Sequence, residues 1–463
     1  MIWTDKQLKE ALSVDIPDHG RLYRKVQFNS KDIQKDDIFI ALSGNRDGHE
    51  FVQDALARGA ACSIISKDIS EIDNKKLVKV KDTRKALDQL ARYKREESNA
   101  KFIAITGSVG KTSTKEALKK VLTAYGKTYA SHGTFNNELG VSLTLSSIPD
   151  DADYAIIEMG MNAKGEISPL SKDVRPDIAI ITTVSEGHIE FFNSVEEIAD
   201  AKCEIFDGMN PKTGIAIINR DMDVYQHCVN NIKNHSKLEN VKTFGIHEES
   251  DVKLVSHEML GNDNTRLVYQ LKGEEIELTI NDIIPTHLAE NLASIFAVLT
   301  ALNLNIEDSF SVMSQIEAIK GRGKIEEIMH NGKSYKIVCD YYNSNPQSLK
   351  ASLLHLAQFE NNKKIAILGD MGELGKNSLA LHEKMVSYIE DSGVSMVFLV
   401  GKFMSHLKNS FKDDLLVKCY DDVNQLIDSI DDYIKGGEMI LMKGSRSRRL
   451  DKLAKHLGVC DVL

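Results

Sequence analysis

Residues 102–118 read FIAITGSVGKTSTKEAL, and this stretch decides the fold. Its apolar start is typical of a buried strand, and its end has the spacing of a helix. The loop between them reads Thr106-Gly107-Ser108-Val109-Gly110-Lys111-Thr112. Glycines let backbone N–H groups turn toward phosphate oxygens, and the N-terminus of the following helix adds partial positive charge. The order of strand, glycine loop and helix therefore predicts a phosphate-binding loop.

Within this loop Lys111 would neutralise the β- and γ-phosphates of a nucleotide, and the Thr112 hydroxyl would bind magnesium. The general pattern GxxxxGK[ST] is not fully met, because its first glycine would fall at Ile105. The alternative interpretation is an ordinary strand-to-helix turn that contains Gly-Lys-Thr. The strand and helix on either side of the loop favour the phosphate-binding interpretation.

The sequence around the loop repeats the alternation of strand and helix. Short apolar runs at 154–157, 178–183 and 214–218 are each followed by helix-period sequence, which predicts βαβ units and a mostly parallel sheet. Residues 251–281 alternate instead and predict an antiparallel addition. A helix is expected from Thr286 to about Leu302.

The two ends of the chain predict further α/β units. Residues 1–98 contain a short strand at 37–42 and a helix near 52–58, and the polar stretch 92–99 suits a linker. The glycines of Ile-Lys-Gly-Arg-Gly, residues 319–323, suit a hinge. Beyond the hinge we expect strands at 335–339, 364–368, 396–400 and 439–442, and helices at 347–359 and 379–389.

We therefore predict an α/β protein with three domains. The first is a small α/β N-terminal domain (1–98), and the second is a central P-loop ATPase domain with a parallel sheet (99–318). The third is a C-terminal Rossmann-like α/β domain (319–463). Two α/β domains joined by a glycine hinge could close on a ligand between them.

Composition limits the partners and the compartment. The 463 residues are 42% hydrophobic and 27% charged, and the formal net charge is -10, which argues against binding to nucleic acid or to an anionic membrane. The cysteines are too far apart for a CxxC site and are expected to be reduced. The N-terminus lacks signal-peptide features, and no apolar run reaches the roughly 18 residues of a membrane span. We expect a cytoplasmic protein without membrane insertion.

Glu158 suggests metal binding near the nucleotide, and two further side chains lie in the segments that follow it. Glu158 follows the strand at 154–157, where a carboxylate would face the ligand crevice of a parallel sheet. His188 follows the next strand, and Lys202 lies in helix-like sequence. Each has an alternative interpretation as an ordinary solvated or incidental residue.

The motifs together resemble the Mur ligase family, whose shortened ATP loop also lacks the first glycine. Family features occur in order along nearly the whole chain: Asn136-Asn137, Glu158, His188, Lys202, His287 with Asn291, Gly321-Arg322 and Asp340. Longer similar stretches are residues 39–42, 47–51, 135–141, 158–167, 201–206, 340–346, 369–375 and 443–446. In Asn29-Ser30-Lys31 the chain departs from the family's more frequent Asp-Ser-Arg near the uridine site.

The resemblance implies a role for each site residue. Lys111 and the loop amides would hold the ATP phosphates, while Thr112 and Glu158 would bind Mg²⁺. His188 would help bind a second Mg²⁺, and Lys202 would match the family lysine that carbon dioxide carbamylates to a metal-binding anion. On the nucleotide, Asn291 would contact adenine, Arg322 would contact the nucleotide and Asp340 would lie near the ribose.

The resemblance also implies an activity. The resemblance is closest to the members that use ATP, through an acyl phosphate, to add D-alanyl-D-alanine to UDP-N-acetylmuramoyl-tripeptide. The N-terminal domain would then bind the UDP substrate. We expect the protein to be a monomer. Alternatives are a sister ligase adding a diamino acid or glutamate, and a nucleotide-dependent switch. The Asp-Asn-Pro-Arg motif of the diamino-acid enzyme is absent.

Two other groups of polar residues attract notice. Asp370, Glu373 and His382 could form a metal site, although a loop at a domain interface is favoured. Arg446, Arg448 and Arg449 form a basic cluster that could meet acidic groups of a substrate or simply lie around the terminal helix.

Overall fold

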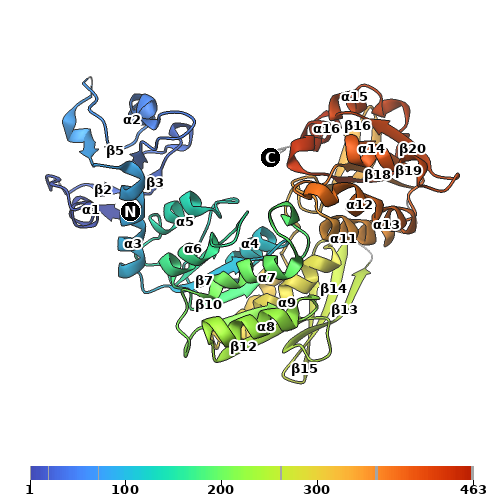
Figure 1. The fold of residues 1–463 in the computed structure, drawn as a ribbon, viewed down its shortest axis with the longest axis horizontal. Coiled ribbons are helices and arrows are strands. Elements are labelled where there is room, and N and C mark those ends of the chain that lie inside the picture. Colours follow the sequence, from blue (N-terminus) through green and yellow to red (C-terminus); the bar gives the residue numbers. More distant parts are fainter. Residues whose placement is uncertain (1, 19, 71, 261–262, 360–362, 460–463) are drawn as a thin grey trace.

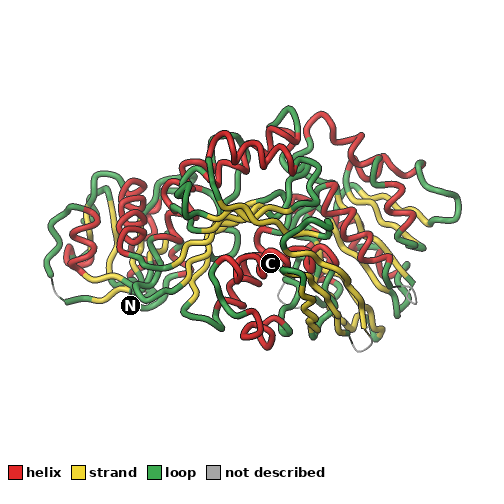
Figure 2. Tube along the Cα trace, turned by 90° about the horizontal axis from the view of Figure 1, so that it is seen from below, coloured by secondary structure: helices red, strands yellow, loops and turns green. Residues whose placement is uncertain are grey.

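The computed structural model describes residues 2–18, 20–70, 72–260, 263–359 and 363–459. The chain forms three α/β units that follow one another along the long axis of the molecule, with the N-terminal unit at one end and the C-terminal unit at the other (Figure 1). Helices flank the strands of the central and C-terminal units (Figure 2). The α/β fold class and the three-unit organisation are confirmed.

The N-terminal unit is built on a parallel sheet with the order β3-β4-β5-β6 and a small antiparallel β1–β2 pair. Its elements are β1 (Trp3–Thr4), α1 (Asp5–Leu12), β2 (Leu22–Tyr23), β3 (Val26–Gln27), β4 (Ile38–Ile40), α2 (Val52–Ala57), β5 (Cys62–Ile65), β6 (Leu77–Lys79) and α3 (Thr83–Glu97).

The linker predicted at residues 92–99 is wrong, because α3 continues to Glu97. The aliphatic stems of its polar residues are used for packing. Lys94 is buried, and its ammonium lies 2.5 Å from Asp150 and 4.6 Å from the centre of the Trp3 ring. The Arg95 guanidinium lies 3.8 Å from the centre of the Phe102 ring. Helix α3 therefore joins the first unit to the second as a packed element.

The central unit contains a nine-stranded sheet with the order β15-β14-β13-β12-β11-β10-β7-β9-β8. Strands β8 to β12 are parallel to their neighbours, and β13, β14 and β15 are antiparallel to one another, as predicted for residues 251–281. The elements are β7 (Lys101–Thr106), α4 (Lys111–Leu122), β8 (Thr128–Ala130), α5 (Glu138–Leu145), β9 (Tyr154–Glu158), α6 (Ile167–Val174), β10 (Ile178–Ile181), α7 (Val195–Cys203), β11 (Ile215–Asn219), α8 (Tyr225–Asn231), β12 (Asn240–Gly245), β13 (Val252–Leu260), β14 (Asn264–Leu271), β15 (Glu274–Ile280), α9 (Thr286–Ala301) and α10 (Phe310–Met313).

Two hydrophobic cores cover the faces of the central sheet. Helices α4 and α9 pack on one face, and α5, α6 and α7 pack on the other. The runs predicted as strands are buried on both sides, as expected for parallel strands between helices. Because β7, β9 and β10 are adjacent and parallel, their carboxyl ends meet at one edge of the sheet.

The C-terminal unit has a six-stranded sheet with the order β16-β17-β21-β18-β19-β20, in which only the β16–β17 pair is antiparallel. Its elements are β16 (Lys324–His330), β17 (Lys333–Asp340), α11 (Pro346–Ala357), β18 (Lys364–Gly369), α12 (Ser378–Glu383), α13 (Val386–Asp391), β19 (Met396–Val400), α14 (Lys402–His406), β20 (Leu416–Tyr420), α15 (Val423–Ile427), β21 (Met439–Lys443) and α16 (Leu450–His456). The single helix predicted at 379–389 is two helices, α12 and α13.

Two further expectations concern reduced cysteines and the lack of a membrane span. Cys62, Cys203, Cys228 and Cys339 are buried free thiols, and Cys419 is a half-buried one; Cys460 lies outside the described residues. Within the described ranges, every helix is too short or too polar to cross a bilayer.

Candidate active site

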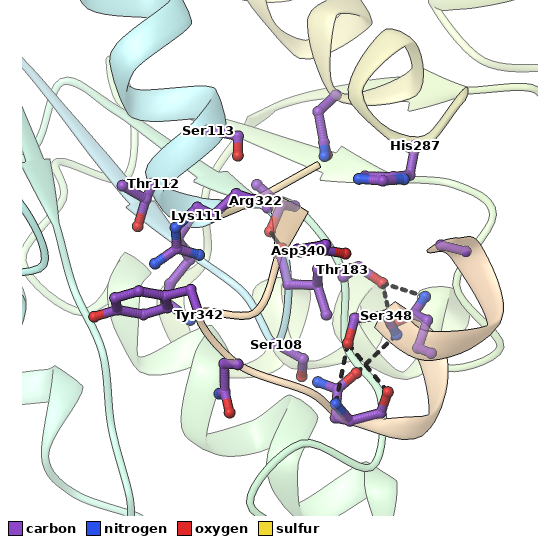
Figure 3. Close-up of a pocket in the computed structure, with 18 of the residues that line it drawn as sticks. Ser108, Lys111, Thr112, Ser113, Thr183, His287, Arg322, Asp340, Tyr342 and Ser348 are labelled. Atoms are coloured by element: carbon purple, nitrogen blue, oxygen red, sulfur yellow. Dashed lines mark hydrogen bonds between the residues drawn. The ribbon is translucent and has the colours of Figure 1, made fainter. Parts of the chain in front are cut away.

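A cleft of about 760 Å³ lies between the central and C-terminal units. The central unit contributes residues from the P-loop and from α9, and the C-terminal unit contributes residues from β17 and α11. Figure 3 shows Lys111, Thr112 and Ser113 near Asp340 and Tyr342. Of the predicted site residues, the cleft is lined by Ser108, Val109, Gly110, Lys111, Thr112, Glu158, His188, Asn291, Arg322 and Asp340.

The P-loop connects β7 to the first turn of α4. Thr106 is the last residue of β7 and is buried, and Gly110 caps α4 with a φ of 87°. The Thr182 hydroxyl fixes the loop, since its Oγ1 lies 2.6 Å from the carbonyl oxygen of Val109. Lys111 Nζ donates to the carbonyl oxygen of Gly107 at 2.7 Å, so the ammonium lies over the loop where phosphate oxygens would be.

The glycine at position 107 is required by its surroundings. A methyl group added there would lie 1.9 Å from Thr182 Oγ1 and 3.1 Å from the Thr183 amide nitrogen, and the φ of 153° disfavours other residues. We expect Gly107→Ala to displace the loop and lower kcat/KM for ATP by about 100-fold or more. Steady-state kinetics with varied ATP checks this.

Gly44→Ala is the matched control, because a methyl group at Gly44 meets no atom within 4 Å. This variant should keep the wild-type KM for ATP. An unchanged KM and kcat in Gly107→Ala would contradict the assignment of a tight phosphate cradle.

Glu158 is a fully buried carboxylate held by several donors. Oε2 accepts a hydrogen bond from the Thr112 hydroxyl at 3.0 Å, and Oε1 accepts one from Asn136 Nδ2 at 2.8 Å. Its backbone amide donates to Ser131 Oγ. A carboxylate beside a hydroxyl at the end of the P-loop is a set of hard oxygen ligands, and this set fits Mg²⁺.

Lys115 was not predicted as part of the site. Its side chain is fully buried, and Nζ donates to the carbonyl oxygens of Ser131 at 2.7 Å and of Gly133 at 2.5 Å. Nζ also lies 3.9 Å from Glu158 Oε2. The sequence feature that could have identified Lys115 is its spacing from Lys111. A residue four positions after Lys111 lies on the same face of α4. Lys115 fixes the loop that leads to Asn136.

Lys202 lies in α7 and is buried behind the wall of the cleft, without lining it. Burial lowers the pKa of its ammonium well below the ordinary value, and the nearby cation of Lys111 lowers it further. Burial also lowers the pKa of Lys111, although the Glu158 carboxylate opposes this. Burial and a neighbouring cation both disfavour the charged form of an amine, so the surroundings of Lys202 favour its uncharged form.

His188 connects the central and C-terminal units. Its Nδ1 lies 2.7 Å from Glu373 Oε2, and this contact lowers the pKa of Glu373. The backbone amide of Glu190 also donates to the carbonyl oxygen of Glu373. His188 has a φ of 67°, an uncommon conformation for a residue other than glycine.

The C-terminal wall is organised around Asp340 and Tyr342. Asp340 Oδ2 accepts a hydrogen bond from Ser352 Oγ at 2.5 Å and lies 2.9 Å from Lys443 Nζ. The Arg322 guanidinium lies 4.1 Å from the centre of the Tyr342 ring. The Tyr342 hydroxyl reaches across the cleft to Thr134 Oγ1 at 3.0 Å. The cleft thus already has polar contacts between its two walls.

Helix α9 supplies the part of the cleft predicted to hold adenine. The Asn291 side chain packs on the P-loop, because a methyl group at Gly110 would lie 2.6 Å from Asn291 Nδ2. Burial lowers the pKa of His287 to about 4, so its imidazole is neutral at pH 7. Neutral polar groups suit an uncharged base better than a phosphate.

Glu290 lines the same part of the cleft and has a strongly perturbed acidity. Burial, together with the Asp221 carboxylate, raises its pKa from 4.5 to about 7. A raised carboxyl pKa makes the folded protein bind more protons, so the folded state loses stability as the pH rises from 4.5 through 7. We expect Glu290→Gln to be more stable than wild type by at most about 3 kcal/mol at pH 8, and by less than about 1 kcal/mol at pH 5.

Thermal unfolding at the two pH values checks the Glu290 prediction. The gain at pH 8 should be about 2–4 °C per kcal/mol. Glu275→Gln, an exposed change on β15, is the control and should alter neither midpoint. A melting temperature of Glu290→Gln that follows wild type at both pH values would contradict the raised pKa.

The remaining conspicuous residues have separate partners. Asp370 Oδ1 accepts a hydrogen bond from the Met404 amide, and His382 Nε2 accepts one from the Met371 amide, while Glu373 faces His188. The arginines also diverge: Arg446 donates to the Tyr342 hydroxyl at 3.3 Å, Arg448 lies 3.8 Å from Asp370, and Arg449 pairs with Asp451. Of these residues, Glu373 and Arg446 contact groups that line the cleft.

Comparisons with known proteins agree with this architecture. The model of the Mur ligase family catalytic domain matches residues 23–95, that of the Mur ligase middle domain matches 105–299, and that of the Mur ligase glutamate ligase domain matches 326–446. A UDP-N-acetylmuramoyl-tripeptide--D-alanyl-D-alanine ligase of Rickettsia prowazekii is 44% identical over 98% of this chain and 100% of that protein.

Solved structures of MurF ligases also match this chain over nearly its whole length. The crystal structure of MurF from Acinetobacter baumannii superposes with a TM-score of 0.83, at 28% identity and with 99% of each chain covered. The MurF ligase of Thermotoga maritima in complex with ADP superposes with a TM-score of 0.78, at 25% identity over 94% of this chain and 97% of that one. The P-loop, the three units and the full-length similarity show that this chain belongs to the Mur ligase family.

Proposed function

We propose that this protein is the ATP-dependent ligase that joins D-alanyl-D-alanine to UDP-N-acetylmuramoyl-tripeptide, producing the UDP-N-acetylmuramoyl-pentapeptide precursor of peptidoglycan. The observation that carries this function is the 44% identity, over essentially the full length of both chains, to an enzyme named for this reaction. The phosphate loop in a cleft between two units supplies the chemical basis.

The reaction needs an activated carboxylate, because oxide is a poor leaving group. Transfer of the γ-phosphoryl group of ATP to the tripeptide carboxylate forms an acyl phosphate and releases ADP. The amine of D-alanyl-D-alanine then attacks the acyl carbon, phosphate leaves, and the amine loses a proton as the amide forms. The protein must align these groups and neutralise developing negative charge.

The P-loop is proposed to hold ATP. The loop from Gly107 to Thr112 leads into the N-terminus of α4, where anions are favoured. Lys111, now donating to the Gly107 carbonyl, is placed to move onto the β- and γ-phosphates. Asn291 would contact adenine, Arg322 would contact the nucleotide, and Asp340 would lie near the ribose.

Mg²⁺ is proposed at the Thr112 hydroxyl and the Glu158 carboxylate, whose oxygens are 3.0 Å apart. Bound there, the ion would offset the charge of the β- and γ-phosphates. His188 is proposed as a ligand of a second Mg²⁺; to serve, its imidazole must exchange its contact with Glu373. The opening and closing of the cleft would govern that exchange.

Carbamylation of Lys202 is proposed because the uncharged amine favoured by its surroundings is the form that reacts with carbon dioxide. The carbamate would place a negative charge beside Lys111, where the ammonium would be repelled. It would also give the second metal an oxygen ligand.

The wider organisation also remains a proposal. We assign residues 1–98 to the UDP-substrate domain, 99–318 to the ATP domain and 319–463 to the domain that closes over the nucleotide. The protein would act as a monomer in the cytoplasm. Size-exclusion chromatography with light scattering tests the oligomeric state.

Phosphate release tests the function directly. Purified protein is incubated with ATP, Mg²⁺, UDP-N-acetylmuramoyl-tripeptide and D-alanyl-D-alanine, and each component is omitted in turn. Phosphate release that requires both substrates, with the pentapeptide product found by mass spectrometry, is expected. Release that requires another amine acceptor would indicate a sister ligase, and release without an acceptor would indicate a nucleotide-dependent switch.

A further inference from the structure

Two histidines and an aspartate from distant segments meet on the C-terminal unit. His330 ends β16, Asp431 lies in the short 3-10 helix Ile430–Asp432, and His456 ends α16. Strand β16 and helix α16 both belong to the end of the molecule that carries the C-terminal sheet (Figure 1). None of the three residues lines the cleft, so the cluster is separate from the proposed ATP site.

The donor atoms of this cluster converge. His330 Nε2 lies 2.7 Å from Asp431 Oδ1, and His456 Nε2 lies 3.9 Å from Asp431 Oδ2. The two imidazole rings have centroids 5.2 Å apart. One ligand atom from each residue falls within 4.8 Å of the other two. Ligand atoms about 2.0–2.2 Å from a tetrahedral Zn²⁺ are about 3.4 Å from one another, which is below this 4.8 Å limit.

Hydrogen bonding accounts for only part of the arrangement. Among the described residues, the His456 imidazole has no hydrogen-bond partner, and its 3.9 Å approach to Asp431 is too long for a hydrogen bond. Asn331 Nδ2 lies 3.1 Å from both His330 Nε2 and Asp431 Oδ2 and helps to hold the carboxylate in place. The side chains of His330, Asp431 and His456 are 12%, 44% and 33% exposed, so an ion could enter from solvent.

We propose that His330, Asp431 and His456 form a zinc-binding site with three protein ligands and one position open to water. Two imidazoles and one carboxylate favour Zn²⁺ over Mg²⁺, which prefers oxygen ligands. The ion links β16 to two segments about a hundred residues later in the chain. Zinc binding therefore stabilises the C-terminal unit against unfolding.

The test uses the full-length, metal-free protein and Zn²⁺ itself. Calorimetric titration and thermal unfolding are compared for wild type, His330→Ala and His456→Ala. We expect wild type to bind one Zn²⁺ more than either variant, or to bind it at least about tenfold more tightly. We also expect Zn²⁺ to raise the melting temperature of wild type but not of the variants, and millimolar Mg²⁺ not to compete.

His227→Ala provides the matched control. His227 Nε2 lies 2.8 Å from Asp200 Oδ1 in the central unit, but this pair belongs to no three-ligand cluster among the described residues. This variant should bind Zn²⁺ as wild type does. Equal Zn²⁺ affinity and stoichiometry in all four proteins would overturn the site, as would loss of binding in only one of the two cluster variants.

Discussion

Replacing Glu158 by glutamine is expected to lower kcat of the ligase by about a thousandfold or more, with the fold unchanged. Glutamine has nearly the same shape but no charge, and its amide nitrogen cannot bind a metal ion. The carboxylate is fully buried, and its Oε2 is 3.0 Å from the Thr112 hydroxyl. Loss of charge stabilisation at one position of a closed site typically costs about 10²–10³ in rate, and loss of a metal adds to this.

Phosphate release with both substrates present measures this effect, and a Mg²⁺ titration shows whether metal affinity falls as well. Glu116→Gln is the control, since Glu116 lies in α4 and pairs with Lys115 at 2.9 Å but is 38% exposed and outside the cleft. Circular dichroism confirms folding of both variants. Near-normal turnover of Glu158→Gln would remove Glu158 from the magnesium site.

The parallel sheets could be predicted because their strands are continuous apolar runs. Residues 102–105, 154–157 and 178–183 correspond to β7, β9 and β10, and the helix expected from Thr286 is α9. The antiparallel addition at 251–281 could also be predicted, since its alternation has a period of two. In each case local pattern and burial agree.

Elements with mixed composition were harder to predict. Residues 92–97 are rich in charge, which suggested a linker, yet they continue α3 because Lys94 and Arg95 pack through their stems. Strand β20 lies at an edge of its sheet and has no fully buried residue, so its sequence pattern is weak. Tertiary packing, which a local pattern does not contain, decides such segments.

The candidate site could be predicted only in part for the same reason. Lys111, Thr112 and Glu158 occur in patterns at strand ends, so their proximity follows from a parallel sheet. The importance of Lys115 depends on the carbonyls of Ser131 and Gly133, which only the folded chain brings together. The cross-cleft contacts of His188 and Tyr342 likewise join residues from different units.

Replacing Lys202 by arginine should lower kcat by about 10²–10³-fold, because arginine stays charged and cannot form a carbamate. Burial lowers the pKa of Lys202, which favours the uncharged amine that adds to carbon dioxide, forming the N–C bond and losing one proton. Carbamylation would put a negative charge beside the Lys111 cation, which attracts it. We therefore expect the carbamate in folded wild type and not in the variant.

Carbon-13 NMR of protein equilibrated with ¹³C-bicarbonate distinguishes this role from a structural one. Wild type should show a carbamate resonance that Lys202→Arg lacks. Lys94→Arg is the control, since Lys94 is also buried but lies 2.5 Å from the Asp150 carboxylate, which opposes the lowering of its pKa by burial; this variant should keep both the resonance and the activity. A wild-type spectrum without the resonance, or full turnover by Lys202→Arg, would contradict the proposed carbamate. In that case His188, which contacts Glu373, would remain as the proposed ligand of the second metal.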